Sequence, residues 1–260
     1  MILYFSATGN TRYVARELAK MLDDECIDLL ARVKNGDNSP LSSEKPFVIC
    51  VPIYVCEMPR FMAAYLKKQS FLGSRDVYFV FTSGGYCGPA GVLAKSMFRK
   101  KGMNYMGGAE ITMPRNYVAS DHYPMLGVEE IEVRLKAAAE HVKQVGEDIL
   151  AGRKLKSRHV YLAETLITLP FNPVWCKIMQ SAKPFYATDA CIACGKCEKL
   201  CPHNNIEMVD GKPRWIKSCA HCMGCIANCP TLAIEYGKIT PGEDRYTFNK
   251  YSYLLKDEEK

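Results

Sequence analysis

Eight of the thirteen cysteines in this 260-residue chain fall in two runs with identical spacing, Cys-x-x-Cys-x-x-Cys-x-x-x-Cys-Pro. The first run holds Cys191, Cys194, Cys197 and Cys201, and the second holds Cys219, Cys222, Cys225 and Cys229. Three thiols in one tight loop and a fourth thiol before a proline are the ligand pattern of a cubane iron–sulfur cluster. The two runs therefore predict two [4Fe-4S] clusters.

This segment resembles the bacterial-type two-cluster ferredoxins, in which the fourth cysteine of each run binds the other cluster. The resemblance implies that Cys191, Cys194, Cys197 and Cys229 hold cluster 1, and that Cys219, Cys222, Cys225 and Cys201 hold cluster 2. Two alternatives are weaker. Zinc favours separated Cys-x-x-Cys pairs, and disulfides need an oxidising compartment, whereas the chain opens on an apolar run with no charged-then-apolar leader.

Length and composition predict one ordinary domain and one small appended module. The chain is 48% hydrophobic, but the cysteine-rich segment has too few apolar residues to fold without metal ligation. So many thiols indicate the reducing cytoplasm of an anaerobe. We find no stretch of about 20 uninterrupted apolar residues, so an integral membrane protein is not expected.

The N-terminus predicts a buried strand over residues 1–5 and a helix over 11–22, with Ser6, Ala7, Thr8, Gly9, Asn10 and Thr11 between or at the edge of them. Such a loop is an anion site, because backbone N–H groups and the helix dipole point at one place. No Walker lysine and no dinucleotide fingerprint are present. The loop resembles the phosphate-binding loop of flavodoxins, which implies FMN; a simple helix cap is the alternative.

Apolar runs predict further strands over 23–30, 46–51, 77–81 and 109–113, and helical spacing predicts helices over 60–69, up to 101 and over 128–152. The expected fold is a flavodoxin-like, doubly wound α/β domain with a five-stranded parallel sheet, followed by a small α+β ferredoxin-like domain. Ligands bind such sheets at the carboxyl ends of the strands. There the resemblance implies flavin contacts from Pro52, Ile53, Tyr54, Thr82, Ser83, Gly84, Gly85, Tyr86, Gly88 and Asn116.

Within that set, Tyr54 and Tyr86 are the candidate ring contacts, with loop packing as the alternative for each. The long loop over 114–127 is expected to close over the flavin or to hold a substrate. Its Tyr117 and His122 are candidate proton donors, although a solvated loop also accounts for His122.

We expect four regions: a flavodoxin-like domain over 1–155, a bridging segment over 156–184, a two-cluster domain over 185–240 and a frayed tail over 241–260. The basic stretch over 153–159 is interpreted as a solvated linker, with docking of an acidic redox partner as the alternative. Prolines interrupt the bridge, which is expected to pack the two domains together through Phe171, Trp175 and Phe185. The five other cysteines are expected to serve as small apolar residues.

The whole chain resembles the flavodoxin–ferredoxin fusions of anaerobes. Clusters move single electrons and a flavin takes one or two, so we predict an electron-transfer flavoprotein that exchanges electrons with a ferredoxin-like or other redox protein. The alternatives are an FMN-dependent reductase acting on a small organic molecule, and a redox sensor; whether the chain is an enzyme stays open. A homodimer would be needed if the clusters served the flavin of a second chain.

The formal charge of +6 invites a nucleic-acid partner. Clusters and a flavin phosphate would each add roughly two negative charges. The loaded protein is then close to neutral, and we predict no nucleic-acid partner.

Overall fold

The computed structural model describes residues 1–122 and 124–256. Its N-terminal part is built on an open sheet of β1 (Ile2–Tyr4), β2 (Cys26–Asp28), β4 (Phe47–Pro52), β6 (Asp76–Ser83) and β7 (Asn104–Thr112). The strands lie in the order β2-β1-β4-β6-β7, and all neighbours are parallel. This is the flavodoxin-like doubly wound order, so the predicted fold class is confirmed.

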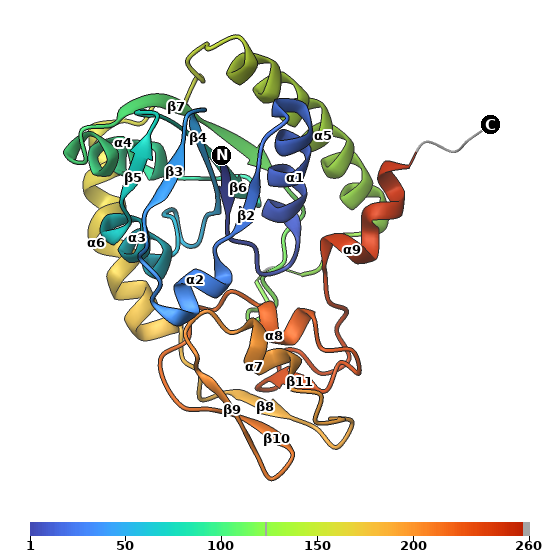
Figure 1. Cartoon of the computed structure of the whole chain (residues 1–260). Helices are drawn as coiled ribbons and strands as arrows, with labels where there is room; N and C mark the ends of the chain where they lie inside the picture. The colour runs from blue at the N-terminus through green and yellow to red at the C-terminus, as the bar shows by residue number, and fades with distance from the viewer. Residues whose placement is uncertain (123, 257–260) are drawn as a thin grey trace.

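Helices cover both faces of the sheet (Figure 1). One face carries α1 (Asn10–Leu22) and α5 (Val128–Leu150), and the other carries α3 (Arg60–Lys68) and α4 (Ala90–Lys100). Successive strand side chains point to opposite faces: Ile2 packs in the core with α1 and α5, and Leu3 packs in the core with α3 and α4. The strands lack polar alternation because both of their faces are buried.

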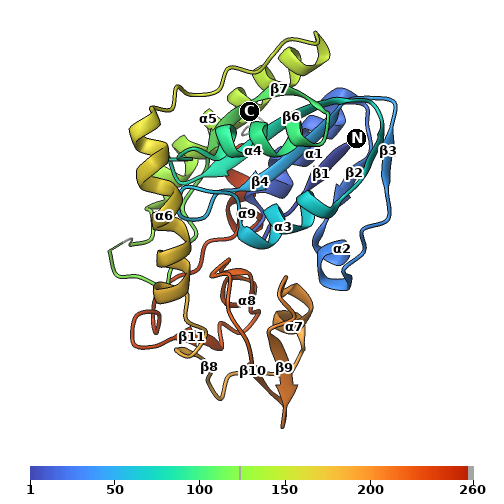
Figure 2. The same cartoon turned by 90° about the vertical axis from the view of Figure 1, so that its left-hand side faces the viewer.

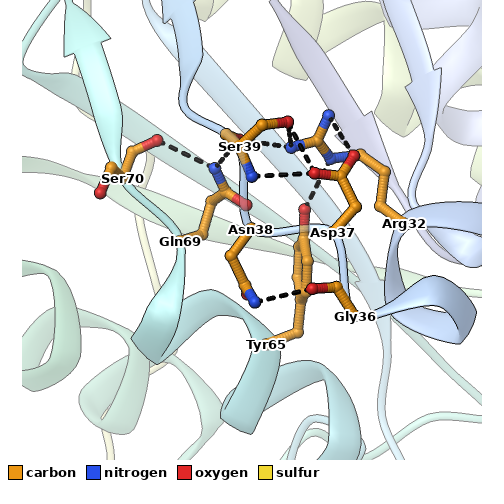
Figure 3. A network of polar contacts seen from close by, with 8 residues as sticks. All are labelled: Arg32, Gly36, Asp37, Asn38, Ser39, Tyr65, Gln69 and Ser70. Carbon is orange, nitrogen blue, oxygen red and sulfur yellow. Dashed lines mark hydrogen bonds and ion pairs between the residues drawn. The ribbon is translucent and has the colours of Figure 1, made fainter.

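The polar connection after β2 is ordered by one arginine (Figure 3). It contains α2 (Leu30–Asn35) and β3 (Leu41–Ser43), and β3 pairs with β5 (Phe71–Gly73). Arg32 donates from Nε to the Tyr65 hydroxyl at 2.9 Å and pairs with Asp37 at 3.1 Å. Hydrogen bonds from Ser39 lower the pKa of Asp37. The connection is therefore pinned to α3.

A long helix, α6 (Leu162–Met179), links the two halves of the chain along the outside of the molecule (Figure 2). It continues through both Pro170 and Pro173, each of which removes one backbone donor. Phe171 and Trp175 from this helix face the N-terminal domain's loops, whereas Phe185 packs in the cluster module. In the described part of the chain, no helix has the length and apolar character needed to cross a bilayer.

The cluster module is a twofold repeat of short elements. It contains β8 (Phe185–Ala187), α7 (Lys196–Leu200), β9 (Ile206–Val209), β10 (Lys212–Trp215), α8 (Gly224–Ala227) and β11 (Ile234–Tyr236). Strands β9 and β10 form an antiparallel hairpin, and β8 pairs antiparallel with β11. A small core closes the module, in which the Phe185 ring stacks on Trp215 with centroids 5.3 Å apart.

The C-terminal segment folds back onto the N-terminal domain as α9 (Phe248–Tyr251) and the 3₁₀ helix η1 (Ser252–Leu255). Tyr246 and Tyr251 are buried in the core beside α1 and α5, and the Phe248 ring stacks on Tyr13 at 4.4 Å. The expectation of a frayed tail is therefore wrong for this segment, because its aromatic residues complete that core. The last four positions of the predicted tail, 257–260, lie outside the described residues.

Candidate functional site

The C-terminal segment packs against the loop between β1 and α1. Gly9 adopts a left-handed conformation with φ of 103°, and a Cβ at this position would lie 2.8 Å from Cβ of Phe248. The backbone N–H of Phe248 donates to the Thr8 carbonyl at 2.8 Å, and the Tyr246 hydroxyl donates to Asn10 Oδ1 at 2.7 Å. Only glycine fits at position 9.

The same loop presents the start of α1 to a cavity. The first N–H groups of a helix have no acceptor within it, and the first turn of α1 carries no acidic residue. The side chain of Thr11 bonds the Thr82 hydroxyl at 2.8 Å, and Asn116 Nδ2 donates to Thr8 Oγ1 at 2.5 Å. Backbone N–H groups and the positive end of the helix dipole are thus available for an anion such as a phosphate.

The cavity has a volume of about 410 Å³ and lies at the carboxyl ends of the strands. It falls within the usual range for small-molecule sites. Of the residues proposed for flavin binding, the ones that line it are Ser6, Ala7, Thr8, Asn10, Thr11, Pro52, Ile53, Tyr54, Thr82, Ser83, Gly84 and Asn116. An apolar slot with polar groups at one end suits a flat ring that carries a phosphate-bearing chain.

One edge of the cavity is a strained turn. Tyr54 and Glu57 exchange backbone hydrogen bonds of 2.8 and 3.3 Å, and the two residues between them, Val55 and Cys56, have φ of 51° and 67°. Positive φ is unfavourable for a β-branched residue and is characteristic of functional sites. Asn172 of α6 holds the turn by donating to the Val55 carbonyl at 2.9 Å.

Four of the proposed contacts, Gly9, Gly85, Tyr86 and Gly88, are not among the residues that line the cavity. The Tyr86 ring is half exposed, and its hydroxyl donates to Glu164 of α6 at 2.6 Å. Arg158 stacks over this ring at 5.1 Å and also bonds Glu164. These contacts lower the pKa of Glu164 to about 2, chiefly through the hydrogen bond from Arg158. Tyr86 thus anchors the start of α6.

The loop after β7 brings a tyrosine to the cavity and leaves its histidine outside. Tyr117 lines the cavity, and its hydroxyl lies 3.1 Å from Nδ1 of His221, which also lines it. His221 Nε2 lies 2.9 Å from the carbonyl of Ser181, which can only accept, so Nε2 carries the hydrogen. His122 is 86% exposed and is 3.6 Å from Asp121. Position 123 in this loop is outside the described residues.

Two small cavities in the cluster module are each lined by four cysteines. Cys191, Cys194, Cys197 and Cys229 line the first, and Cys201, Cys219, Cys222 and Cys225 line the second. These are the two sets that the ferredoxin resemblance implies. Among the described residues, no three His, Cys, Asp or Glu side chains are grouped to hold a single metal ion; the four thiols surround a space.

The two cysteine loops repeat in backbone conformation as well as in sequence. Ala193 and Gly195 are left-handed in the first loop, with φ of 52° and 67°, and His221 and Met223 are left-handed at the matching positions of the second, with φ of 47° and 60°. Left-handed residues at these positions turn successive N–H groups inward, which makes an anion-binding concavity. Both loops are therefore shaped to wrap an anionic cluster.

The pKa of the buried thiols also bears on whether they can bind iron. Burial raises the pKa of Cys222 to about 12. The thiolate is the form that binds metal, so a buried thiol at this position releases its proton only when a bound cation compensates the charge. The residues present therefore fit iron–sulfur clusters in both cavities and a flavin in the larger one.

The second cysteine loop shares a wall with the flavin cavity. Asn228 donates from Nδ2 to the Ala7 carbonyl at 3.0 Å, and a Cβ on Gly224 would lie 3.6 Å from Cβ of Ala7. Lys34 of α2 donates to the Cys201 carbonyl at 3.0 Å. Accordingly, α8 faces the N-terminal domain, whereas the β9–β10 hairpin points away from it (Figure 1). Cys194 of the first loop is exposed.

Several residues of this site were not singled out from the sequence. No sequence motif marks His221, which stands between two cysteines, and none marks Asn228, Asn172 or Tyr246. Each acts across a large separation in the chain; the bond from Asn228 to Ala7 spans 221 positions. No local pattern marks such residues, because their partners come from another domain.

Comparison with known families agrees with this geometry. The family model of the flavodoxin domain matches residues 1–106, and that of the 4Fe-4S dicluster domain matches residues 183–242. No curated protein matches the chain.

Solved structures that resemble the chain include a proposed flavoprotein from Bacteroides eggerthii, with 19% identity, coverage of 53% of this chain and 96% of that one, and a TM-score of 0.31. A flavodoxin from the domain Archaea has 15% identity, coverage of 55% and 96%, and a TM-score of 0.31. The rubredoxin oxygen:oxidoreductase of the anaerobe Desulfovibrio gigas has 13% identity, coverage of 58% and 36%, and a TM-score of 0.30.

The fold, the two four-cysteine cavities and the matched family models agree on a flavodoxin domain followed by a 4Fe-4S dicluster domain. The chain is a fusion of a flavodoxin domain, which implies a flavin, with a 4Fe-4S dicluster domain, which implies iron–sulfur clusters.

Proposed function

We propose that this protein passes electrons between a ferredoxin-like carrier, two [4Fe-4S] clusters and one FMN bound in the same chain. One observation carries the proposal: the loop of Cys219, Cys222 and Cys225 forms part of the wall of the flavin cavity through His221, and Asn228, just after this loop, donates to the carbonyl of Ala7 in the same wall. Two redox sites that share a wall need no second chain to bring them together, so a homodimer is not required for transfer. We also propose a cytoplasmic location, where thiols stay reduced.

In this proposal the residues have separate tasks. The loop over residues 6–11 holds the phosphate with backbone N–H groups, and the turns over 52–56 and 82–84 hold the ring. Phe171 and Trp175 of α6 cover the ring and exclude water. When bound, the clusters supply one-electron transfer and FMN supplies one- or two-electron chemistry. Because Cys194 is exposed and Cys225 is buried, we expect the carrier to dock at the first cysteine loop.

Anaerobic purification with analysis of iron, sulfide and flavin tests the cofactors. We expect about eight iron atoms and about one FMN per chain. A flavin-free preparation that cannot be reconstituted with FMN would remove the flavin part of the proposal.

Rapid mixing with a reduced ferredoxin tests the path. Cys222→Ser should abolish flavin reduction by the carrier while FMN stays bound, and Cys26→Ser, which changes a cysteine outside both runs, should leave the rate unchanged. Equal rates in the wild type and Cys222→Ser would contradict transfer through the second cluster.

A second function, reduction of a small organic molecule at the flavin, is favoured by one feature of the cavity. Helix α6 walls it, and the Tyr117 hydroxyl is held inside it by His221. A pure carrier needs only an exposed flavin edge, whereas a reductase needs an enclosed site with a proton donor. Tyr117→Phe should then slow anaerobic turnover of a quinone while the iron and FMN content stay unchanged. Quinone turnover that is independent of Tyr117 would argue for the carrier function alone.

A further inference from the structure

The outer side of α6 is a wide apolar face. Leu162, Leu166, Ile167 and Ile178 are each more than 60% exposed, and together with Val174 we call them the α6 apolar face. The helix has 18 residues, about 27 Å of length. The outer side carries a single charge, Lys177, since Glu164 is turned toward Arg158 and Tyr86. Soluble monomers rarely expose so many neighbouring aliphatic side chains unless something binds there.

The two helices on the same side of the molecule are basic. Figure 2 faces this side, on which α3, α4 and α6 lie uncovered by other elements. The exposed cations of α3 and α4 form what we call the basic face: Arg60, Lys67, Lys68, Lys95, Arg99 and Lys100. Neither helix contains an acidic residue. In the described residues, no carboxylate forms an ion pair with any of the six.

The opposite side carries charges of both signs. The helix α5 carries six acidic residues, Glu129, Glu130, Glu132, Glu140, Glu147 and Asp148. The basic residues of α5 (Arg134, Lys136 and Lys143) and of α1 (Arg12, Arg16 and Lys20) offset most of this negative charge. The unbalanced positive charge of the helices therefore lies on the side of α3 and α4, where α6 also lies. Basic residues beside an apolar helix orient a protein against a surface that offers both negative charge and apolar chains.

We propose that the α6 apolar face and the basic face together bind the surface of an anionic lipid membrane. An interfacial helix buries its apolar side at the boundary of headgroups and acyl chains, and nearby basic residues each add about 1 kcal/mol on an anionic leaflet. Helix α6 lies in the surface in this arrangement and does not cross it. Helix α6, which walls the flavin cavity with Phe171 and Trp175, then lies between that cavity and the membrane.

Two other occupants fit this surface less well. A second copy of this chain docked through the same face in a twofold dimer would set the two basic faces against each other, because such an interface is self-complementary. A nucleic acid would be attracted to the basic face through its phosphates but gains nothing from aliphatic side chains, which neither stack on bases nor bind phosphate. An anionic lipid surface can bind both the α6 apolar face and the basic face.

Flotation of the anaerobically prepared holoprotein with vesicles tests the proposal. The vesicles are phosphatidylcholine alone, or phosphatidylcholine with about one third phosphatidylglycerol. We expect binding to the anionic vesicles at least about fivefold tighter, falling as salt rises from about 0.1 M to about 0.5 M because the charges are screened. Equal binding to both vesicles, or no binding to either, would overturn the proposal.

Paired variants test the contributions of the α6 apolar face and the basic face to membrane binding one at a time. Ile167→Glu should weaken binding at least about tenfold, and Val133→Glu on α5, which is equally exposed, should leave it unchanged. Lys67→Gln and Lys95→Gln should each weaken binding about fivefold, with Lys143→Gln on α5 as the control. Iron and FMN content verify that each variant is folded. A protein that sediments as a dimer and becomes monomeric in Ile167→Glu would assign the face to self-association and contradict the proposal.

Discussion

The two domains of this chain are held together by different physics. The flavodoxin domain buries continuous apolar strands between two helical layers, with side chains such as Phe79 and Leu18 fully excluded from water. The cluster module has one small core, and two of that core's buried members, Cys197 and Cys225, are cysteines assigned to iron. The first domain is therefore specified by side-chain packing, and the second needs ligation to offset its chain entropy.

Removal of iron should produce the largest difference in stability between the two domains. Anaerobic treatment with a chelator is expected to unfold residues 185–236, because the thiols lose the ligand that compensates their burial. Amide hydrogen exchange should show this region losing protection while β1 and β4 keep theirs. Loss of protection in both domains together would mean that they form one cooperative unit, and retention in both would mean that the module folds without iron.

A core truncation should act on the other domain alone. Phe79 is fully buried, with its ring 5.1 Å from that of Phe98 and 5.5 Å from that of Phe81. Phe79→Ala should lower the free energy of unfolding of the flavodoxin domain by about 3–5 kcal/mol, measured by urea denaturation. The exposed Val133→Ala on α5 is the control. A loss below about 1 kcal/mol, or loss of the iron–sulfur absorbance in parallel, would contradict independent stabilisation.

A smaller effect is expected where the end of the chain returns to the phosphate loop. The Tyr246 hydroxyl donates to Asn10 Oδ1 at 2.7 Å, and both residues are buried. Tyr246→Phe leaves that oxygen without its donor, which should lower the free energy of unfolding by about 1–3 kcal/mol. FMN binding should weaken as well, because Asn10 begins α1.

The matched control is Tyr253→Phe in the same segment, since Tyr253 is 55% exposed. FMN titration followed by fluorescence measures the binding. Unchanged FMN affinity in Tyr246→Phe would mean that the C-terminal segment only fills the core and does not position the loop.

The sheet and the cysteine repeat were readable in the sequence because their signals are local. Uninterrupted apolar runs such as residues 47–51 mark strands buried on both faces, and the observed strand order confirms the fold that they predicted. The spacing of the cysteines is enough by itself to predict iron–sulfur clusters. The grouping of the eight cysteines could only be inferred by resemblance, because spacing does not say which fourth thiol closes which cluster.

What the sequence did not disclose depends on distant partners. The aromatic residues after position 240 have no helical or strand period, so nothing indicated that Tyr246 and Phe248 brace a loop at the other end of the chain. Tyr86 follows a strand end, where the flavodoxin resemblance predicts a flavin contact, and only the structure shows that its hydroxyl donates to Glu164, 78 positions away. Pro170 and Pro173 argue against a helix in the sequence, because each lacks a backbone N–H donor. The structure nevertheless continues α6 through both of them, and packing stabilises the helix.

The smallest expected effect concerns the start of α6, which joins the two domains. Glu164 accepts hydrogen bonds from Tyr86 and Arg158, and they lower its pKa from 4.5 to about 2. A carboxylate with a depressed pKa stabilises the folded state above its unfolded pKa, and this contribution is lost as the pH falls through the folded value. The contact should therefore persist at pH 5 and weaken between about pH 4 and pH 2.

Amide hydrogen exchange over residues 160–168, measured as a function of pH and corrected for the intrinsic rate, reports this release. Glu164→Gln should raise exchange there at pH 5–7 and remove the acid-dependent step, whereas Glu140→Gln on α5 should retain it. Because the pair is partly exposed, the change should stay local: the middle of α6, which Asn172 ties to the Val55 carbonyl, should keep its protection. If the whole helix is released together, α6 is a single rigid strap between the domains, and the two regions are coupled more tightly than their separate cores indicate.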